Sequence, residues 1–393
     1  MSDNITQITE LNTQETPQRT TFAKKAVVLV VTAVAVCFFV ALFLFNDALN
    51  FDTVLRWGKY FASGADEDFG SYSFDFHSSN CYAGFDDGLA VASIGGLNVY
   101  DESGTEIQVL QRQLELPRML VNDEMALAYD VGGNALIALH EKRGEVLSLE
   151  QTYPILDADL SEKGAVCISS SASGYKSVLS VYNEGQELIY RWLSSSTYFP
   201  LCAVSPDADA LAAVAVGQSE GTFESRICLF NTDAEDIQCE ISLGNELIYD
   251  LVYLREDLLC AVGESSVQVV STSGEVIGKY EYKDDYLKDF DFGGDGFLTL
   301  STNMYRAGNR FTLVTLNEKG RELDTLAIGK EVLDISACGR YIAVLTPGKV
   351  TVYNQSLSVY YEVSDAADIT SVVMREDGTV LLIGGGKGKL YIP

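Results

Sequence analysis

The sequence predicts an all-β fold, an eight-bladed β-propeller preceded by one transmembrane helix, from three observations. They are a repeated strand motif, dense Gly, Asp and Ser turns, and one long apolar run near the amino terminus. The motif reads apolar-x-apolar-apolar, then Asn, Asp, Ser or His, a short polar turn and a new apolar start. Its copies span residues 97–107, 136–146, 179–189, 227–237, 267–277, 313–323 and 350–360. A strand-built repeat of about forty residues is typical of a propeller.

Each repeat divides into four strands. Tight turns such as FDDG at residues 85–88 and REDG at residues 375–378 end a first strand, because Gly and Asp tolerate the positive φ that hairpins need. A short apolar run follows, such as LAVAS at residues 89–93, and it predicts a buried second strand. The motif itself is the third strand. The more polar segment after the motif is the outer strand.

Residues 71–393 form the predicted propeller, and its closure decides the number of blades. The chain ends in KLYIP at residues 389–393, a third strand with no outer strand after it. An unpaired edge invites aggregation, so a segment from the front of the chain must complete this blade. Residues 71–76, SYSFDF, alternate correctly, and residues 54–61 are the second candidate. Eight blades follow, with seven as the alternative if the copy around residues 119–150 is misread.

The apolar run at residues 26–45 predicts a transmembrane signal anchor over residues 26–46. The run carries no charge, and twenty helical residues span about 30 Å, the thickness of a hydrocarbon core. A cleaved signal peptide would have a shorter apolar region that ends at small residues. Lys24 and Lys25 abut the run, so the positive-inside rule predicts a single-pass protein of the cell membrane with residues 1–25 in the cytoplasm and the propeller outside.

Two polar segments flank the anchor. Residues 1–25 are rich in Thr, Gln and Asn and lack apolar periodicity, which predicts a disordered cytoplasmic tail. Residues 47–70 connect the anchor to the propeller as a stalk, and Asp66, Glu67 and Asp68 keep this stalk in solvent.

Charge and residue usage exclude several classes of function. The chain has 56 acidic and 27 basic residues and a net charge of -29, which repels phosphate backbones and argues against nucleic-acid binding. Its cysteines form no C-x-x-C pair, and its two histidines, His77 and His140, lie far apart, so we expect no metal site and no cofactor. His140 occupies the slot that Asp101 or Asn183 fills in other copies, which indicates a structural role.

Four aspartates recur near the predicted inner strands and are the candidate ligand-binding residues. Asp159, Asp250, Asp289 and Asp334 lie in the segments DADL, IYDLVY, LKDFDF and LDIS. Inner strands line the channel of a propeller, so these side chains would form an acidic throat. The alternative is that they bond backbone amides at the junctions between blades. The chain shows no nucleophile–base pattern, so no catalytic residue is assigned.

The apolar anchor, the short stalk and the V-Y-N third strands at residues 181–183 and 352–354 resemble an uncharacterised family of membrane-anchored propellers from Gram-positive bacteria. The resemblance covers residues 26–393 and implies a propeller outside the membrane. A more distant likeness to quinoprotein-like and WD-type propellers is limited to architecture. The chain departs from both, because Trp57 and Trp192 are its only tryptophans and no Trp-Asp dipeptide ends a blade.

These observations favour a membrane-anchored, extracytoplasmic binding or scaffold module without enzymatic activity. Its loops would present a surface to a protein or cell-envelope partner. One alternative is an enzyme acting on cell-envelope carbohydrate with throat carboxylates such as Asp250 and Asp289, which requires two carboxyl groups about 5–9.5 Å apart. Another is a sensor whose cytoplasmic tail relays ligand binding.

Overall fold

The structure, a computed structural model, describes residues 29–34, 36, 56, 58–60, 69–185, 187–219 and 221–393. The chain divides into two compact units, Met1–Lys59 and Tyr60–Pro393. In the first unit residues 29–34 are helical, and most of the predicted tail, anchor and stalk lies outside the described residues. No helix in the described part of the chain is both long and apolar enough to cross a bilayer.

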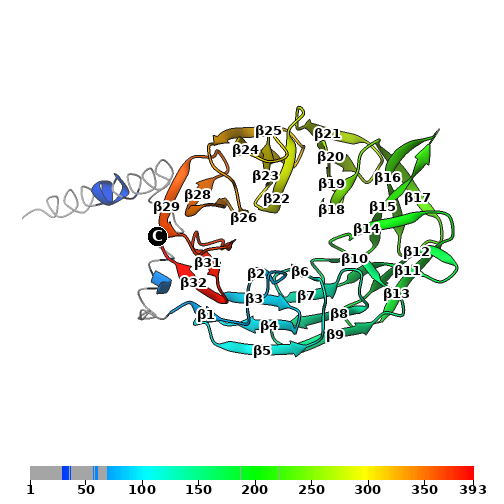
Figure 1. The fold of residues 1–393 in the computed structure, drawn as a ribbon, viewed down its shortest axis with the longest axis horizontal. Helices are drawn as coiled ribbons and strands as arrows, with labels where there is room; N and C mark the ends of the chain where they lie inside the picture. The colour runs from blue at the N-terminus through cyan, green and yellow to red at the C-terminus, as the bar shows by residue number, and fades with distance from the viewer. Residues whose placement is uncertain are drawn as a thin grey trace, which may run out of the picture. The chain divides into compact units, whose positions relative to one another are not determined.

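The second unit folds into eight four-stranded antiparallel sheets, the blades of a propeller, arranged in a ring (Figure 1). In each blade we call the strands A to D, from the inner strand to the outer one. Blade 1 comprises β2 (Cys81–Phe85), β3 (Gly88–Ser93), β4 (Gly96–Tyr100) and β5 (Glu106–Gln111). Blade 2 comprises β6 (Pro117–Val121), β7 (Met125–Asp130), β8 (Ala135–His140) and β9 (Gly144–Glu150). Blade 3 comprises β10 (Ile155–Leu160), β11 (Val166–Ala172), β12 (Tyr175–Tyr182) and β13 (Leu188–Ser194).

The remaining blades repeat this order. Blade 4 comprises β14 (Tyr198–Val204), β15 (Ala210–Ser219), β16 (Thr222–Asn231) and β17 (Ile237–Gly244), and blade 5 comprises β18 (Ile248–Arg255), β19 (Leu258–Gly263), β20 (Ser266–Ser271) and β21 (Val276–Glu281). Blade 6 comprises β22 (Tyr286–Gly294), β23 (Phe297–Asn303), β24 (Phe311–Asn317) and β25 (Glu322–Ile328), and blade 7 comprises β26 (Asp334–Cys338), β27 (Tyr341–Thr346), β28 (Gly348–Asn354) and β29 (Val359–Ala366). Blade 8 comprises β30 (Ser371–Met374), β31 (Val380–Gly384), β32 (Lys387–Tyr391) and, as its outer strand, β1 (Ser71–Ser73).

These sheets confirm the all-β, eight-bladed prediction. The copy around residues 119–150, on which the seven-bladed alternative depended, is the complete blade 2, so that alternative is wrong. Strands B and C form the core, and β7, β8 and β19 bury every residue. Because neighbouring blades cover both faces of these strands, their sequences are continuous apolar runs rather than alternating patterns.

The first strand closes the ring, as its alternating sequence predicts. β1 pairs with β32, and Tyr72 lies opposite Gly388 in the register. The N–H of Phe74 donates to the carbonyl of Gly386 at 3.0 Å, beyond the end of the strand. The predicted strand at residues 71–76 is therefore correct in its first half.

Contacts between blades 1 and 8 stabilise this closure of the ring, which we call the seam. The Arg375 guanidinium, in the A–B turn of blade 8, donates to the hydroxyl of Tyr72 at 3.1 Å and to the carbonyl of Gly88 at 2.9 Å. Gly104 lies in the C–D turn of blade 1, and a Cβ there would come within 1.9 Å of the Ser71 carbonyl. Only glycine permits so close an approach of the two backbones.

Most repeats have a short polar residue at the end of strand C, a position that we call the polar slot. The side chain at this slot closes the C–D turn that follows. In blade 6 the Oδ1 atom of Asn317 accepts hydrogen bonds from the N–H groups of Lys319 at 2.9 Å and Arg321 at 3.1 Å. Bonds of this kind also close the turns that begin at Asp101, Asn183, Asn231, Ser271 and Asn354. Short polar side chains recur at this slot because they bond the backbone of the turn that follows them.

Candidate functional site

Two of the predicted aspartates accept hydrogen bonds from the neighbouring blade. The Oδ2 atom of Asp159, on β10, accepts a hydrogen bond from the N–H of Val204, on β14, at 2.9 Å. The Oδ2 atom of Asp334, on β26, accepts bonds from the hydroxyl of Ser371 at 2.7 Å and the N–H of Val372 at 2.8 Å, both on β30. Each carboxylate therefore links the inner strands of adjacent blades.

Asp250 and Asp289 lie on the inner strands of blades 5 and 6. The Oδ1 atom of Asp250 accepts a bond from the N–H of Leu251 at 2.8 Å, and that of Asp289 accepts one from the N–H of Phe290 at 2.9 Å. Burial raises the pKa of Asp250. Burial and the nearby Asp334 carboxylate raise the pKa of Asp289 to about 7.

A further half-buried aspartate of the inner strands, Asp157, belongs with this set, although the sequence prediction omitted it. Its Oδ2 atom accepts a bond from the N–H of Cys202 at 2.9 Å, and its Oδ1 atom accepts one from the hydroxyl of Tyr129 at 3.0 Å. Burial raises the pKa of Asp157 and of Asp159 to about 7. The segment DADL contained the signal, because residues two apart on a strand share one face.

The inner-strand carboxylates fall into two groups. Asp157, Asp159 and Asp250 interact electrostatically around blades 3 to 5, and Asp289, Asp291 and Asp334 do so around blades 6 and 7. The hydrogen bonds of Asp159 and Asp334 join neighbouring blades. A ligand-binding role for the four predicted aspartates stays a prediction. Within the described residues, no group of three or more His, Cys, Asp or Glu is placed to hold a metal ion.

The two faces of the ring carry different side chains. Loops that join strand B to C, and strand D to the next strand A, form one face. The exposed aromatic side chains of the described chain all lie on this face: Phe76, Tyr153, Tyr175, Tyr198, Tyr249, Tyr286 and Tyr305. Exposed Ile94, Leu116, Leu247, Met304 and Leu333 accompany them. We call this surface the aromatic face.

The opposite face is formed by the A–B and C–D turns, and we call it the acidic face. Its turns carry runs of carboxylates: Asp86 and Asp87, Asp101 and Glu102, Asp123 and Glu124, Asp207 and Asp209, Asp233, Glu235 and Asp236, Glu256 and Asp257, and Glu376 and Asp377. Acidic residues far outnumber basic residues in these turns, so the negative charge of the propeller is concentrated there. Charge of this kind favours solubility and repels anionic partners.

Two tyrosines of the aromatic face each carry a cation over the ring. The Nζ atom of Lys176 lies 5.0 Å from the ring centroid of Tyr198. The guanidinium carbon of Arg306 lies 5.4 Å from the ring centroid of Tyr286. At an exposed site each such cation–π contact contributes about 0.5–1 kcal/mol, which favours one arrangement of the two side chains. The face therefore presents large flat rings, two of them beside a positive charge.

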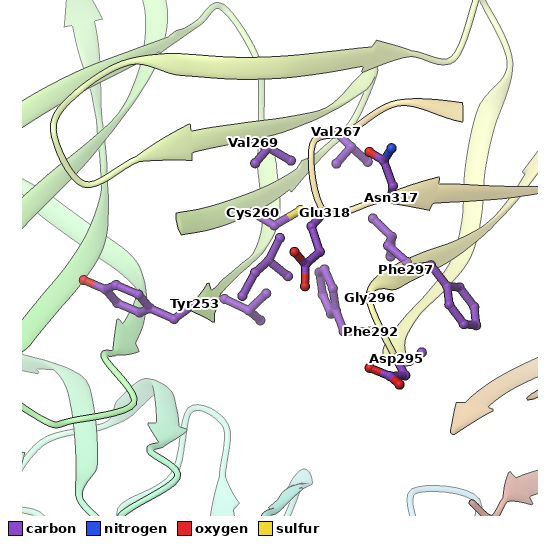
Figure 2. Close-up of a pocket in the computed structure, with 15 residues that line it drawn as sticks. Tyr253, Cys260, Val267, Val269, Phe292, Asp295, Gly296, Phe297, Asn317 and Glu318 are labelled. Carbon is purple, nitrogen blue, oxygen red and sulfur yellow. The ribbon is translucent and has the colours of Figure 1, made fainter. Parts of the chain in front are cut away.

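A cavity of about 320 Å³ lies between blades 5 and 6 (Figure 2). Val267, Phe292 and the buried thiol of Cys260 contribute to its lining, and burial raises the pKa of that thiol. Glu318 adds a carboxylate to the lining, but this group already pairs with the guanidinium of Arg255 at 3.1 Å. The cavity is at the lower end of the size range of small-molecule sites.

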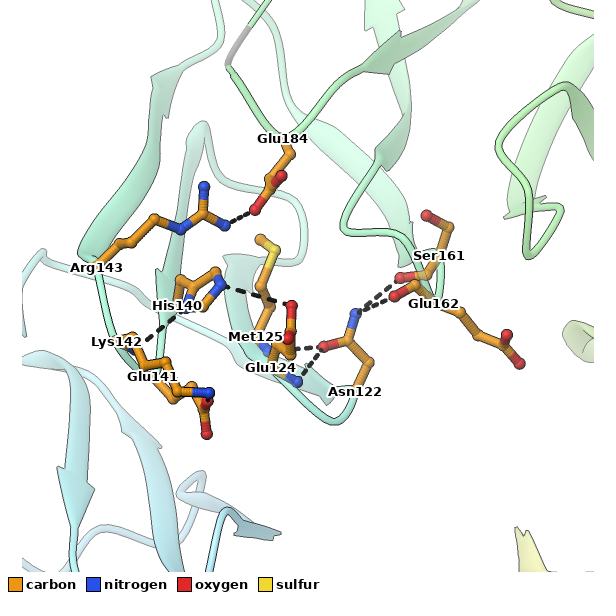
Figure 3. Close-up of polar contacts among 10 residues, drawn as sticks. All are labelled: Asn122, Glu124, Met125, His140, Glu141, Lys142, Arg143, Ser161, Glu162 and Glu184. Atoms are coloured by element: carbon orange, nitrogen blue, oxygen red, sulfur yellow. Dashed lines mark hydrogen bonds and ion pairs between the residues drawn. The ribbon is translucent and has the colours of Figure 1, made fainter.

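His140 takes part in a polar network on the acidic face (Figure 3). His140 is 6% exposed, its Nδ1 atom accepts a bond from the N–H of Lys142 at 3.1 Å, and its Nε2 atom lies 3.6 Å from the Glu124 carboxylate. The amide of Asn122 donates to the carbonyl of Ser161, in the next blade, at 2.8 Å. The imidazole therefore closes a turn, which is the structural role that its slot indicates.

The solved structures that resemble this chain include several WD40 propellers. The C-terminal WD40 domain of Sif2 has a TM-score of 0.58 and 13% identity, over 83% of this chain and 98% of that domain. The WD40 repeats of RRP9 have a TM-score of 0.46 and 9% identity, over 68% and 86% of the two chains. U3-55K has a TM-score of 0.45 and 9% identity, over 68% and 91%. The likeness to the Sif2 domain confirms the distant similarity to WD-type propellers and supports the fold alone.

Sequence comparison identifies the family. No curated protein matches the chain. Residues 70–388 match a family of unknown function, DUF5711, and this span contains nearly the whole propeller. The expected resemblance to an uncharacterised propeller family is thereby confirmed, while membrane anchoring and a Gram-positive origin stay predictions. The chain belongs to the DUF5711 family.

Proposed function

We propose that the protein is a non-enzymatic binding module that docks a protein partner on its aromatic face. One observation carries the proposal: the exposed aromatic side chains of the described propeller all lie on one face of the ring. Tyr and Met are enriched at the centres of protein interfaces, and Tyr often dominates the binding energy. Isolated exposed aliphatic residues, such as those on the outer strands, are ordinary, whereas exposed aromatic side chains gathered on one face indicate an interaction surface.

The rigidity of the ring supports this use of the aromatic face. Tyr175, Tyr198 and Tyr286 are the first residues of β12, β14 and β22, so strands rather than long loops fix their positions. Rings held in this way lose little conformational entropy when a partner covers them. Functional loops on a rigid scaffold are a common arrangement in binding proteins.

No observation favours the carbohydrate-active alternative. The carboxylates of Asp159 and Asp334 accept bonds from the neighbouring blade, and those of Asp250 and Asp289 accept bonds from backbone N–H groups. A glycosidase needs one carboxyl group free to protonate the leaving oxygen and a second free to act on the sugar or on a water. The sensor alternative depends on the tail, which lies outside the described residues.

The proposal includes attachment to the cell membrane with the propeller outside. It is supported by the apolar run at residues 26–45 and by Lys24 and Lys25 before it. Protease added to intact cells without a wall should remove the propeller and leave an amino-terminal tag protected. Digestion of the propeller only after lysis would contradict this orientation.

The docking surface is tested by comparing two double variants in a crosslinked pull-down from envelope extracts. Tyr198→Ser with Tyr249→Ser removes rings that are 54% and 46% exposed on the aromatic face. Val276→Ser with Val359→Ser removes side chains that are 54% and 55% exposed on outer strands. We expect the first variant to lose partner capture by about tenfold or more and the second to keep it. Equal capture by both variants would contradict docking on the aromatic face.

A further inference from the structure

The long loop between β23 and β24 forms a distinct part of the aromatic face. Together with the start of β22 it brings cations and apolar side chains into one surface, which we call the blade 6 patch: Tyr286, Lys288, Met304, Tyr305, Arg306 and Arg310. Met304 is 49% exposed and Tyr305 is 46% exposed. Arg306 stacks over the ring of Tyr286, and its carbonyl accepts a bond from the Nζ atom of Lys288 at 2.6 Å.

A buried amide holds this loop in one conformation. Asn303 is 1% exposed, and its Nδ2 atom donates to the carbonyl of Gly308 at 2.8 Å. Its Oδ1 atom accepts a bond from the N–H of Tyr305 at 3.1 Å. The N–H of Met304 donates to the carbonyl of Arg310 at 3.2 Å and closes the base of the loop. The loop is therefore preorganised, which lowers the entropy cost of binding.

The cations of the patch have no carboxylate partner in the part of the chain that the structure describes. Several basic side chains elsewhere in the propeller pair with acids: Arg112 with Glu150, Lys142 with Glu141, Arg143 with Glu184, Lys163 with Asp207, Arg226 with Glu240, Arg255 with Asp257 and Glu318, Lys279 with Glu281, and Lys349 with Glu362. The neighbouring Asp285 lies 3.4 Å from the Thr302 hydroxyl, which donates to it. In a chain with a net charge of -29, these cations are left available to an outside anion.

We infer that the blade 6 patch binds an acidic peptide segment of the docked partner, one that carries apolar side chains among its carboxylates. The inference rests on the proposed function. Arg306 and Arg310 offer planar guanidinium groups, which pair with carboxylates through two parallel hydrogen bonds. Met304 and Tyr305 offer adaptable apolar surface that a purely anionic polymer would leave unused. Because the chain as a whole is acidic, the patch also determines where on the propeller such a segment binds.

The test measures binding of a fluorescent peptide made of alternating glutamate and leucine or tyrosine. The full chain is kept in a mild non-ionic detergent, and binding is followed by fluorescence anisotropy. Arg306→Glu with Arg310→Glu should weaken binding by about tenfold or more. The control, Lys319→Glu with Arg321→Glu, makes the same change of charge in the C–D turn of the same blade, on the acidic face. It should change the affinity by less than about twofold. An equal loss in both variants would overturn the inference.

Two further probes identify which chemical features of the peptide the patch recognises. A peptide with glutamine in place of glutamate should bind at least about tenfold more weakly, because it lacks the charge. Polyglutamate and polyglycerol phosphate should bind more weakly than the mixed peptide, because neither offers apolar side chains to Met304 and Tyr305. If the glutamine peptide binds equally well, the charged part of the inference is wrong. If either polyanion binds as tightly as the mixed peptide, the site accepts anions in general and the peptide inference is wrong.

Partner capture separates this inference from the wider proposal. If Arg306→Glu with Arg310→Glu retains the partner that the Tyr198 and Tyr249 double variant loses, docking on the aromatic face stands and the acidic-peptide inference fails. If the mixed peptide depends on the two arginines while the tyrosine variant still captures the partner, the inference stands and the wider docking surface fails.

Discussion

At the scale of single residues, the half-buried aspartates of the inner strands make stability depend on pH. Burial raises the pKa of Asp157, Asp159 and Asp289 to about 7 in the folded protein, whereas an aspartate in an unfolded chain titrates near pH 4. The fold therefore favours the protonated carboxyl groups. Their contribution to stability is complete below about pH 4 and is lost as the pH rises through about 7.

Asp159→Asn tests this pH dependence. Asparagine keeps an oxygen that accepts the bond from the N–H of Val204 but carries no charge at any pH. Between about pH 5 and pH 8, the free energy of unfolding of the wild type should fall by about 1–3 kcal/mol more than that of the variant. Urea unfolding at each pH measures the difference. Parallel pH profiles would contradict a raised pKa at this position.

The seam arginine gives a second prediction at the residue scale. Arg375→Met keeps much of the side-chain length but removes the donors to the Tyr72 hydroxyl and the Gly88 carbonyl. Because Arg375 is 9% exposed, these acceptors lose their partner in a buried place, and the free energy of unfolding should fall by about 2–3 kcal/mol. Thermal unfolding measures the loss. A variant as stable as the wild type would show that the seam does not depend on this side chain.

At the scale of elements, β1 is predicted to contribute more to stability than its three residues suggest. Tyr72 is 2% exposed and packs in a cluster with Tyr100 and Leu390. Tyr72→Ala should lower the free energy of unfolding by about 3–5 kcal/mol and, by loosening β1, expose the edge of β32 to aggregation. Tyr198→Ala is the matched control, because Tyr198 is 54% exposed. Calorimetry that finds equal losses for the two variants would contradict the closure by β1.

The order of the elements was predictable because the turns repeat. Asn317 and Asn354 close C–D turns through their side chains, so the polar slot is visible in the sequence wherever strand C ends. Strand B was predictable from its apolar composition. The closing strand was predictable only because an incomplete last repeat needs an outer strand, and its length was overestimated because the alternation of SYSFDF continues after the pairing ends at Ser73.

The candidate site was predictable only in part. The sequence showed that aspartates recur near the inner strands, but the direction of a side chain depends on register and on bulges, such as the one between Ile248 and Asp250. The aromatic face was not predicted. Tyr153 and Tyr249 are far apart in the sequence, and each is an isolated loop tyrosine until the strand directions place both on the same face.

At the scale of the whole molecule, the concentration of carboxylates on the acidic face predicts that the thermal stability of the propeller depends on the salt concentration. Like charges repel one another in the folded ring, and salt screens this repulsion. Raising NaCl from about 0.02 M to about 0.5 M should raise the melting temperature by a few degrees. Asp233→Asn with Glu235→Gln should reduce this gain. A melting temperature that falls with added salt would show that ion pairs outweigh the repulsion.

The pairing of β1 with β32 also has a consequence for synthesis. On the ribosome Ser71–Ser73 emerges before the rest of the propeller, and its partner Lys387–Tyr391 follows only after blades 1 to 7. At about 5–20 residues per second, the wait is on the order of tens of seconds. Until then the ring of the nascent protein is open, and β1 has no strand to pair with. A translation product that stops before Lys387 cannot complete the circle, however well its earlier blades have folded.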